Sequence, residues 1–213
     1  MSKRSYAQHI AGAVIDDDTD EQLKYRYLVK KDKCRDTWIK SLENELGRLA
    51  QGIRDIKGTD TISFVHKSEI PKDRLKEVTY GRIFVAYKPN KSEPHISRLT
   101  VGGDRIVFLY NVRTPTADLP TIKMLWNSVL STPGARYMTL DISNFYLGTP
   151  MDRPEYMRLP LKLILQDILD KYKLNDIADN GWVYLKIVKG MYGLPQSGKL
   201  AHDLLKKRLG EAG

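Results

Sequence analysis

Hydrophobic residues recur along the chain in two rhythms, one with a period of about four residues and one with a period of two. The first predicts helices and the second predicts strands, because each rhythm places apolar side chains on one face. Helical spacing covers residues 38–49, 118–131, 161–172 and 197–209, and strand patterns cover 61–66, 82–88, 95–101, 105–110, 136–142 and 182–188. Strands that follow one another, with separate helices between them, predict an α+β fold.

Residues at the ends of these segments support the assignment of the helices. Asp36-Thr37, Asp118 and Ser197 stand where an N-cap side chain is expected, and Pro120 falls in the first turn of its helix, where its missing N–H does no harm. The helix after Asp118 is expected to bury one apolar stripe. That stripe consists of Ile122, Leu125, Trp126, Val129 and Leu130.

Three of the predicted strands indicate more than local structure. Residues 82–88 and 95–101 flank Pro89–Pro94, whose composition is typical of a turn, so they predict a hairpin. In residues 136–142, alternation places Met138, Leu140 and Ile142 on one face and Asp141 on the other. A carboxylate at a strand end is most often structural, and catalysis is the rarer alternative.

Residues 1–36 differ from the rest of the chain in composition. They are polar and mixed in charge and end in a lysine-rich stretch. We expect a short extended piece followed by a linker.

Charge and composition narrow the classes of function. The formal net charge is +9, and residues 67–113 hold ten Lys and Arg against five Asp and Glu. A basic balance favours binding to nucleic acid, although a solvated lysine-rich face is the simpler interpretation. Cys34 is the only cysteine, which excludes an internal disulfide and a cysteine-built zinc site.

No apolar run reaches the roughly 18 residues that a membrane span needs. We therefore expect an intracellular protein without a membrane partner. The cytoplasm is the expected location, with the nucleus as an alternative.

The segment Gly193–Lys199 has the spacing G-x-x-x-x-G-K, close to that of a phosphate-binding loop between a strand and a helix. Leu200 stands where such a loop needs Ser or Thr, and Pro195 removes one backbone N–H donor. Nucleotide binding through this loop is therefore the weaker interpretation.

Four motifs, in this order, resemble the reverse transcriptases of copia-type LTR retrotransposons. The first two resemble the family's opening helix and a strand of its fingers, and the last two its palm segment and its Tyr-Gly-Leu-Lys-Gln loop. They are Trp38-Ile-Lys-Ser-Leu-Glu43, Ser97-Arg-Leu-Thr-Val-Gly-Gly103, Asp141-Ile-Ser-Asn-Phe-Tyr-Leu-Gly148 with Glu155-Tyr-Met-Arg-Leu-Pro160, and Tyr192-Gly-Leu-Pro-Gln196. Each motif is weak or moderate alone, and together they cover residues 37–213.

The resemblance implies the fingers and a partial palm of a right-hand polymerase. Residues 37–117 would be fingers, residues 118–213 partial palm, and residues 1–36 the end of an upstream polyprotein linker. The implied activity is RNA-directed DNA synthesis with two Mg²⁺ ions. The implied partners are an RNA or DNA template-primer, deoxynucleoside triphosphates and the rest of the Pol polyprotein. The resemblance also makes a virus-like particle an alternative location.

The same resemblance assigns roles to individual residues. Asp141 would be the first catalytic carboxylate and would bind both Mg²⁺ ions. Tyr146 would reject a ribose 2′-OH, and Gln196 would line the nucleotide pocket near the 3′-OH. Arg98, with Lys88 or Lys91, would contact the triphosphate.

This sequence departs from the family pattern at three points. Phe145 replaces a small alanine, Pro195 replaces a lysine, and the 213 residues contain no Tyr-x-Asp-Asp motif. We therefore expect the chain alone to be inactive, with part of the apolar face around Met138, Leu140 and Ile142 exposed. The alternatives are a non-catalytic nucleic-acid-binding module and a decayed open reading frame.

Overall fold

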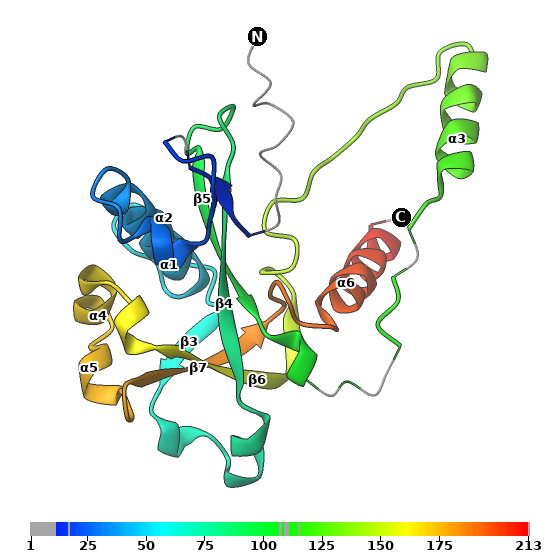
Figure 1. The fold of residues 1–213 in the computed structure, drawn as a ribbon. Coiled ribbons are helices and arrows are strands. Elements are labelled where there is room, and N and C mark those ends of the chain that lie inside the picture. The colour runs from blue at the N-terminus through cyan, green and yellow to red at the C-terminus, as the bar shows by residue number, and fades with distance from the viewer. Residues whose placement is uncertain (1–11, 17, 107, 109–110, 115, 213) are drawn as a thin grey trace.

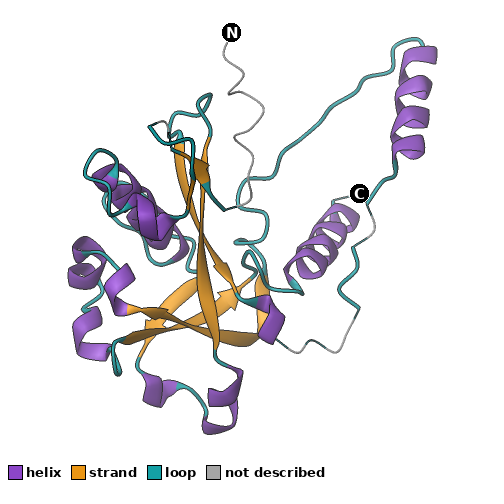
Figure 2. Ribbon diagram, in the orientation of Figure 1, coloured by secondary structure: helices purple, strands orange, loops and turns teal. Residues whose placement is uncertain are grey.

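The computed structural model describes residues 12–16, 18–106, 108, 111–114 and 116–212 (Figure 1). A five-stranded sheet has the order β3-β7-β6-β4-β5. Its strands are β3 (Ile62–Val65), β4 (Thr79–Tyr87), β5 (His95–Val101), β6 (Pro150–Pro160) and β7 (Trp182–Lys189). The predicted α+β class is confirmed, because separate helices surround a mainly antiparallel sheet (Figure 2).

The sheet is antiparallel except where β4 meets β6, through the pairs Thr79–Met157 and Tyr80–Arg158. The two halves of the sheet are therefore the β3-β7-β6 group and the β4–β5 hairpin. The hairpin matches the prediction from alternation in both strands. Buried side chains of β6 and β7, among them Met157, Leu159, Val183, Leu185 and Ile187, form the middle of the core.

Helix α2 (Arg35–Leu49) packs along β5, the last strand of the sheet. The predicted stripe is buried, with Trp38 at 3% and Leu42 and Leu46 at 1% exposure. Side chains of α2 also occupy the free backbone groups of β5. Ser41 Oγ donates to His95 O at 2.9 Å and accepts from Ser97 N at 2.8 Å. An edge that would otherwise invite strand pairing is thereby closed.

Glu45, which is buried, makes a further hydrogen bond from α2 to β5. Its carboxyl group also leads to a testable prediction about stability and pH. Its Oε1 accepts a hydrogen bond from Leu99 N at 3.3 Å, and burial raises the pKa of the Glu45 carboxyl above its ordinary value, against the opposing charges of Arg48 and Arg98. The folded protein therefore holds this proton to higher pH than the unfolded chain does, so Glu45 makes stability fall as pH rises through its folded pKa. We expect Glu45→Gln, which can still accept from Leu99, to remove this fall. Urea unfolding at a series of pH values measures it.

The exposed Glu93→Gln in the β4–β5 turn is the matched control and should unfold with the pH dependence of the unmodified chain. If Glu45→Gln also keeps that dependence, then the buried carboxyl does not hold its proton in the folded state.

The N-terminal segment is folded over residues 14–28, where composition predicted a short extended piece followed by a linker. Residues 14–28 form strands β1 (Val14–Ile15) and β2 (Gln22–Leu23), which pair, and the short helix α1 (Tyr25–Leu28). Val14, Leu23, Tyr25 and Leu28 lie in the same buried cluster as α2. Four well-spaced apolar side chains were enough to anchor a segment whose average composition is polar. Residues 1–11 lie outside the described part.

The helix predicted over 161–172 is broken into shorter pieces. They are the 3-10 turn η5 (Leu161–Leu163) and the helices α4 (Gln166–Lys171) and α5 (Leu174–Ile177). Ile164 and Leu165 have extended backbones between η5 and α4. Ile164 and Ile168 are both buried, and the break lets both side chains reach the core. Other 3-10 turns are η2 (Lys67–Glu69), η3 (Lys72–Glu77) and η4 (Gly103–Arg105).

The strand expected over residues 105–110 is not formed by its described residues. Arg105 belongs to η4, and residues 107, 109 and 110 lie outside the described part. The helix after it, α3 (Leu119–Ser131), begins as predicted. Asp118 Oδ1 accepts from Thr121 N at 2.8 Å, and Pro120 sits in the first turn.

The predicted burial of the α3 stripe is wrong. Leu125 and Trp126 are each 53% exposed and Leu130 is 86% exposed, and α3 stands away from the sheet (Figure 1). The predicted strand over 136–142 is wrong as well, because these residues are extended without a partner strand. Met138 and Leu140 are 74% and 78% exposed, which confirms the expected exposure of that face. The sequence pattern marks faces suited to burial, but no described part of the chain covers them.

This exposed apolar surface predicts a simple physical behaviour. An apolar helix and the return segment behind it should bind a hydrophobic dye and promote association. We expect the paired substitution Leu125→Glu and Leu130→Glu to reduce the fluorescence of bound 8-anilinonaphthalene-1-sulfonate by about half or more. Lys206→Glu and Lys207→Glu on the exposed side of helix α6 (Ser197–Glu211) make the matched control for charge. Equal dye binding by both variants would contradict an exposed α3.

No helix in the described residues is long and apolar enough to cross a membrane.

Candidate functional site

The loop between β7 and α6 is clamped against the end of β5. Tyr192 O accepts a hydrogen bond from Val101 N at 2.8 Å. Gly193 has a φ of +92°, and a Cβ placed there would lie 2.2 Å from Val101 O. Only glycine allows this approach without strain, so Gly193 fixes the place where the loop crosses the sheet.

Tyr192 is the point at which three distant segments meet. The Arg98 guanidinium carbon of β5 lies 4.7 Å from the centroid of the Tyr192 ring. The Tyr146 ring, which precedes β6, lies 5.7 Å from the Tyr192 ring at an angle of 78°. These are a cation–π contact and an edge-to-face aromatic contact. The fold therefore brings together two of the predicted nucleotide-binding residues, Arg98 and Tyr146.

Backbone contacts hold Tyr146 in this position. Thr149 N donates to Tyr146 O at 2.9 Å, and Gly148 N donates to Asn144 O at 3.0 Å. Asn144 adopts a φ of +54°, which asparagine tolerates better than most residues. A Cβ on Gly190 would lie 2.8 Å from Tyr146 O. The turn around Tyr146 therefore packs closely against Gly190, which begins the loop between β7 and α6, here called the Tyr192 loop.

Gln196 ends the same loop and is the N-cap residue of α6. Its side chain is 4% exposed, and its Oε1 has no hydrogen-bond partner among the described residues. A buried acceptor without a partner is uncommon, and it marks a position where a donor from a ligand or water would be favourable. Ser197, expected to cap α6, instead binds the loop: its Oγ accepts from Met191 N at 2.9 Å and donates to Met191 O at 2.8 Å.

The hydrogen bonds of this loop bear on the phosphate-loop alternative. Leu194 N donates to Met191 O and Ser197 N donates to Leu194 O, so two N–H groups of the loop are already used. Lys199 Nζ forms an ion pair with Asp203 on the next turn of α6. Because two N–H groups of the loop and the Lys199 ammonium are engaged within the protein, fewer donors are left for a phosphate, which does not favour that alternative.

Asp141 lies apart from these contacts in the extended segment before Tyr146. Its side chain is exposed, and it makes no hydrogen bond or ion pair with another described residue. Among the described residues, no group of three or more His, Cys, Asp or Glu side chains is placed to hold a metal ion. A single carboxylate does not fit the two Mg²⁺ ions that the resemblance implies.

Lys88 and Lys91 lie at the tip of the β4–β5 hairpin. Lys88 N donates to Pro94 O at 2.7 Å and Lys91 N donates to Lys88 O at 3.0 Å, which closes the predicted turn. Both side chains are exposed. The structure places them on the hairpin that carries Arg98. Among the described residues, no contact joins their side chains to Arg98, Tyr146 and Tyr192, here called the Tyr192 cluster.

A second cationic and aromatic group adjoins the loop. The guanidinium carbons of Arg82 and Arg105 lie 4.9 Å and 5.0 Å from the centroid of the Tyr80 ring. Tyr80 OH donates to Asp104 Oδ1 at 2.7 Å, and this hydrogen bond lowers the pKa of the Asp104 carboxyl. Arg82 on β4 and Arg105 on η4, against the single carboxylate of Asp104, therefore leave a net positive charge in this group.

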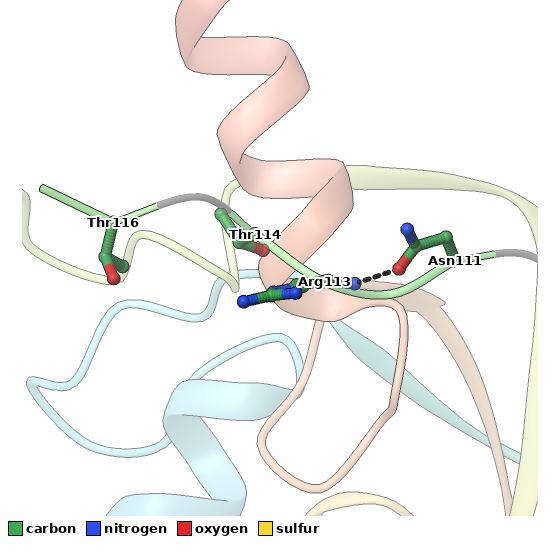
Figure 3. A pocket seen from close by; sticks show the side chains of 4 residues that line it. All are labelled: Asn111, Arg113, Thr114 and Thr116. Atoms are coloured by element: carbon green, nitrogen blue, oxygen red, sulfur yellow. Dashed lines mark hydrogen bonds between the residues drawn. The ribbon is translucent and has the colours of Figure 1, made fainter.

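A pocket of about 360 Å³ lies where the chain from Asn111 to Thr114 crosses in front of α6 (Figure 3). Asn111, Arg113, Thr114 and Thr116 line it, and Asn111 Oδ1 accepts from Arg113 N at 2.8 Å. Thr114 Oγ1 lies 3.4 Å from the position of a Cβ on Gly198, in the first turn of α6. Through Arg113, the pocket places one more positive charge near the start of α6.

Comparisons with models of protein families, with curated proteins and with solved structures gave no match. The functional interpretation therefore depends on the residues themselves. Tyr192 is the central residue that the sequence did not single out. It was visible only as part of a motif, and its role depends on contacts between residues far apart in the chain.

Proposed function

We propose that this chain forms the fingers and part of the palm of a copia-type reverse transcriptase. The complete enzyme would carry out Mg²⁺-dependent, RNA-directed DNA synthesis, and this chain would be inactive by itself. The observation that carries the proposal is the convergence of Arg98, Tyr146 and the loop from Tyr192 to Gln196. These residues come from three segments that the resemblance assigned to one nucleotide site.

The chemistry of the cluster suits an incoming deoxynucleoside triphosphate. Arg98 offers a planar, permanently charged fork that pairs well with phosphate oxygens. In this structure its guanidinium lies on the Tyr192 ring, a contact worth only about 0.5–1 kcal/mol when exposed, so phosphate can compete for it. Tyr146 offers a rigid ring for the sugar, and the Gln196 side chain retains an unpaired acceptor.

In the proposal, the chain is inactive because it supplies too few carboxylates to bind the metal ions. Asp141 is the one predicted metal ligand, and the sequence holds no Tyr-x-Asp-Asp motif. The exposed apolar residues of α3 and of the segment 136–142 are the surface that a further part of the palm would cover. A chain joined to the Tyr-x-Asp-Asp segment of a copia-type enzyme, here called the extended chain, allows the proposal to be tested.

The role of Tyr146 predicts a change in sugar selectivity. In the extended chain, Tyr146→Val removes the ring that would meet a ribose 2′-OH, so the preference for dTTP over UTP should fall by about tenfold to a hundredfold. Primer extension on poly(rA)/oligo(dT) gives kcat/KM for each nucleotide. Tyr137→Val, which removes an exposed tyrosine from the neighbouring extended segment, is the matched control. A preference that stays within about twofold of the parent would refute the assignment of Tyr146.

A further inference from the structure

A second pocket, of about 330 Å³, lies away from the Tyr192 cluster and is not used by the proposed function. Four segments line it: the β1–β2 hairpin, the stretch that joins α1 to α2, the first turns of α2, and the β4–β5 hairpin. Its volume falls at the lower end of the range for small-molecule pockets, about 300–1,000 Å³. All of its lining residues belong to the described part of the chain.

Three rings form the floor of this pocket. The His95 ring lies 5.1 Å from Trp38, almost perpendicular at 89°, and 5.1 Å from Tyr87 at 52°. A flat ligand ring in the pocket can make offset or edge contacts with side chains of this kind. Trp38 is 3% exposed and belongs to the core, so the floor is rigid on that side.

His95 also offers hydrogen bonds that the protein does not use. Its backbone oxygen is bound by Ser41, but among the described residues neither ring nitrogen makes a hydrogen bond. Burial lowers the pKa of the His95 imidazole, so at neutral pH one ring nitrogen is a donor and the other an acceptor. A ligand ring that carries one N–H and one bare nitrogen would complement it.

The rim of the pocket is balanced in charge. Lys31 forms an ion pair with Asp16, and Lys33 forms one with Asp18 at 3.1 Å. Two ammonium groups and two carboxylates give no net charge for a phosphate or a quaternary amine to recognise. The pocket therefore favours an uncharged ligand, in contrast to the Tyr192 cluster.

From these features we infer that the pocket between the N-terminal hairpin and the β4–β5 hairpin binds a small, uncharged heteroaromatic ring. The ring contacts Tyr87, over the floor that Trp38 supports from the core, and exchanges a hydrogen bond with the His95 imidazole. Such binding would also join the N-terminal segment to the β4–β5 hairpin, because the ligand touches both. The inference stands independently of the polymerase assignment.

Cys34 provides a local reporter for this site. It lines the pocket, is half-buried, and is the only cysteine in the chain. Benzimidazole is a suitable probe, because it is flat, uncharged near pH 8 and carries one donor and one acceptor nitrogen. With benzimidazole at about ten times its Kd, we expect alkylation of Cys34 by iodoacetamide to slow about tenfold. Cyclohexanol, which is apolar but not aromatic, should give no protection at equal concentration.

Two variants of the full chain complete the test. His95→Phe keeps a ring but removes both nitrogens, and it should weaken benzimidazole about tenfold, the effect of one hydrogen bond. Thr37→Phe fills the pocket from an exposed position on α2 and should abolish protection even if His95→Phe fails to fold. Saturation-transfer NMR on benzimidazole measures the same affinities without the thiol. The inference is overturned if benzimidazole gives no protection, if cyclohexanol protects equally, or if Thr37→Phe leaves benzimidazole binding unchanged.

Discussion

In the extended chain, Asp141→Asn lowers the rate of primer extension by at least about a hundredfold, the effect of removing one strong electrostatic stabiliser. Asparagine preserves the size and shape of the side chain but lacks the negative charge that a hard cation such as Mg²⁺ prefers. The loss should appear in kcat more than in KM for dTTP, because the proposed nucleotide contacts come from Arg98, Tyr146 and Gln196. Steady-state extension of oligo(dT) on poly(rA) measures both constants.

Asp152→Asn is the matched control for that experiment. Asp152 is an exposed carboxylate on β6, and the polymerase assignment gives it no role. Its substitution should leave extension within about twofold of the parent rate. If Asp141→Asn behaves like this control, Asp141 does not belong to the catalytic site and the palm assignment for residues 138–148 is lost.

The second large effect concerns stability and the position of the Tyr192 loop. Gly193→Ala should lower the free energy of unfolding by about 3 kcal/mol, because alanine is strained at positive φ and its methyl group would meet the Val101 carbonyl. A Cβ at this position lies 2.2 Å from Val101 O and 2.8 Å from Val101 N, which are backbone atoms that cannot move aside alone. For a chain of this size we expect the Tm to fall by about 10 °C.

Gly181→Ala separates the two causes. Gly181 also has a positive φ, of +77°, but a Cβ there would meet nothing within 4 Å. Its substitution carries only the conformational penalty, about 1 kcal/mol. Differential scanning calorimetry of both variants tests the difference. Equal losses at the two positions would show that the Tyr192 loop is not pressed against β5.

Local pattern was sufficient for the elements whose contacts are close in sequence. Alternation over 82–88 and 95–101, with a proline-rich turn between them, predicted the β4–β5 hairpin and so the strand that carries Arg98. The helical spacing from Trp38 predicted α2 and its buried face. The cap at Asp118 predicted the start of α3. In each case the decisive information lies within about twenty residues.

Elements that depend on a distant partner could not be predicted in this way. The stripe of α3 and the alternation of 136–142 mark surfaces for burial, yet no described residue covers them. The contacts of Tyr192 join residues 98, 146 and 192, and a sequence pattern does not show which aromatic residue becomes their common centre. In the N-terminal segment, by contrast, packing was underestimated from the sequence. Its average composition is polar, but a few of its apolar side chains pack in the same buried cluster as α2.

Primer extension by the 213-residue chain beside the extended chain, on poly(rA)/oligo(dT) with Mg²⁺ and dTTP, tests the central claim most directly. The proposal predicts extension by the extended chain and none by the shorter one, with both binding the template-primer. Extension by the 213-residue chain alone would contradict the claim that its catalytic site is incomplete. Salt-sensitive binding without extension by either chain would contradict the polymerase assignment and favour a nucleic-acid-binding module.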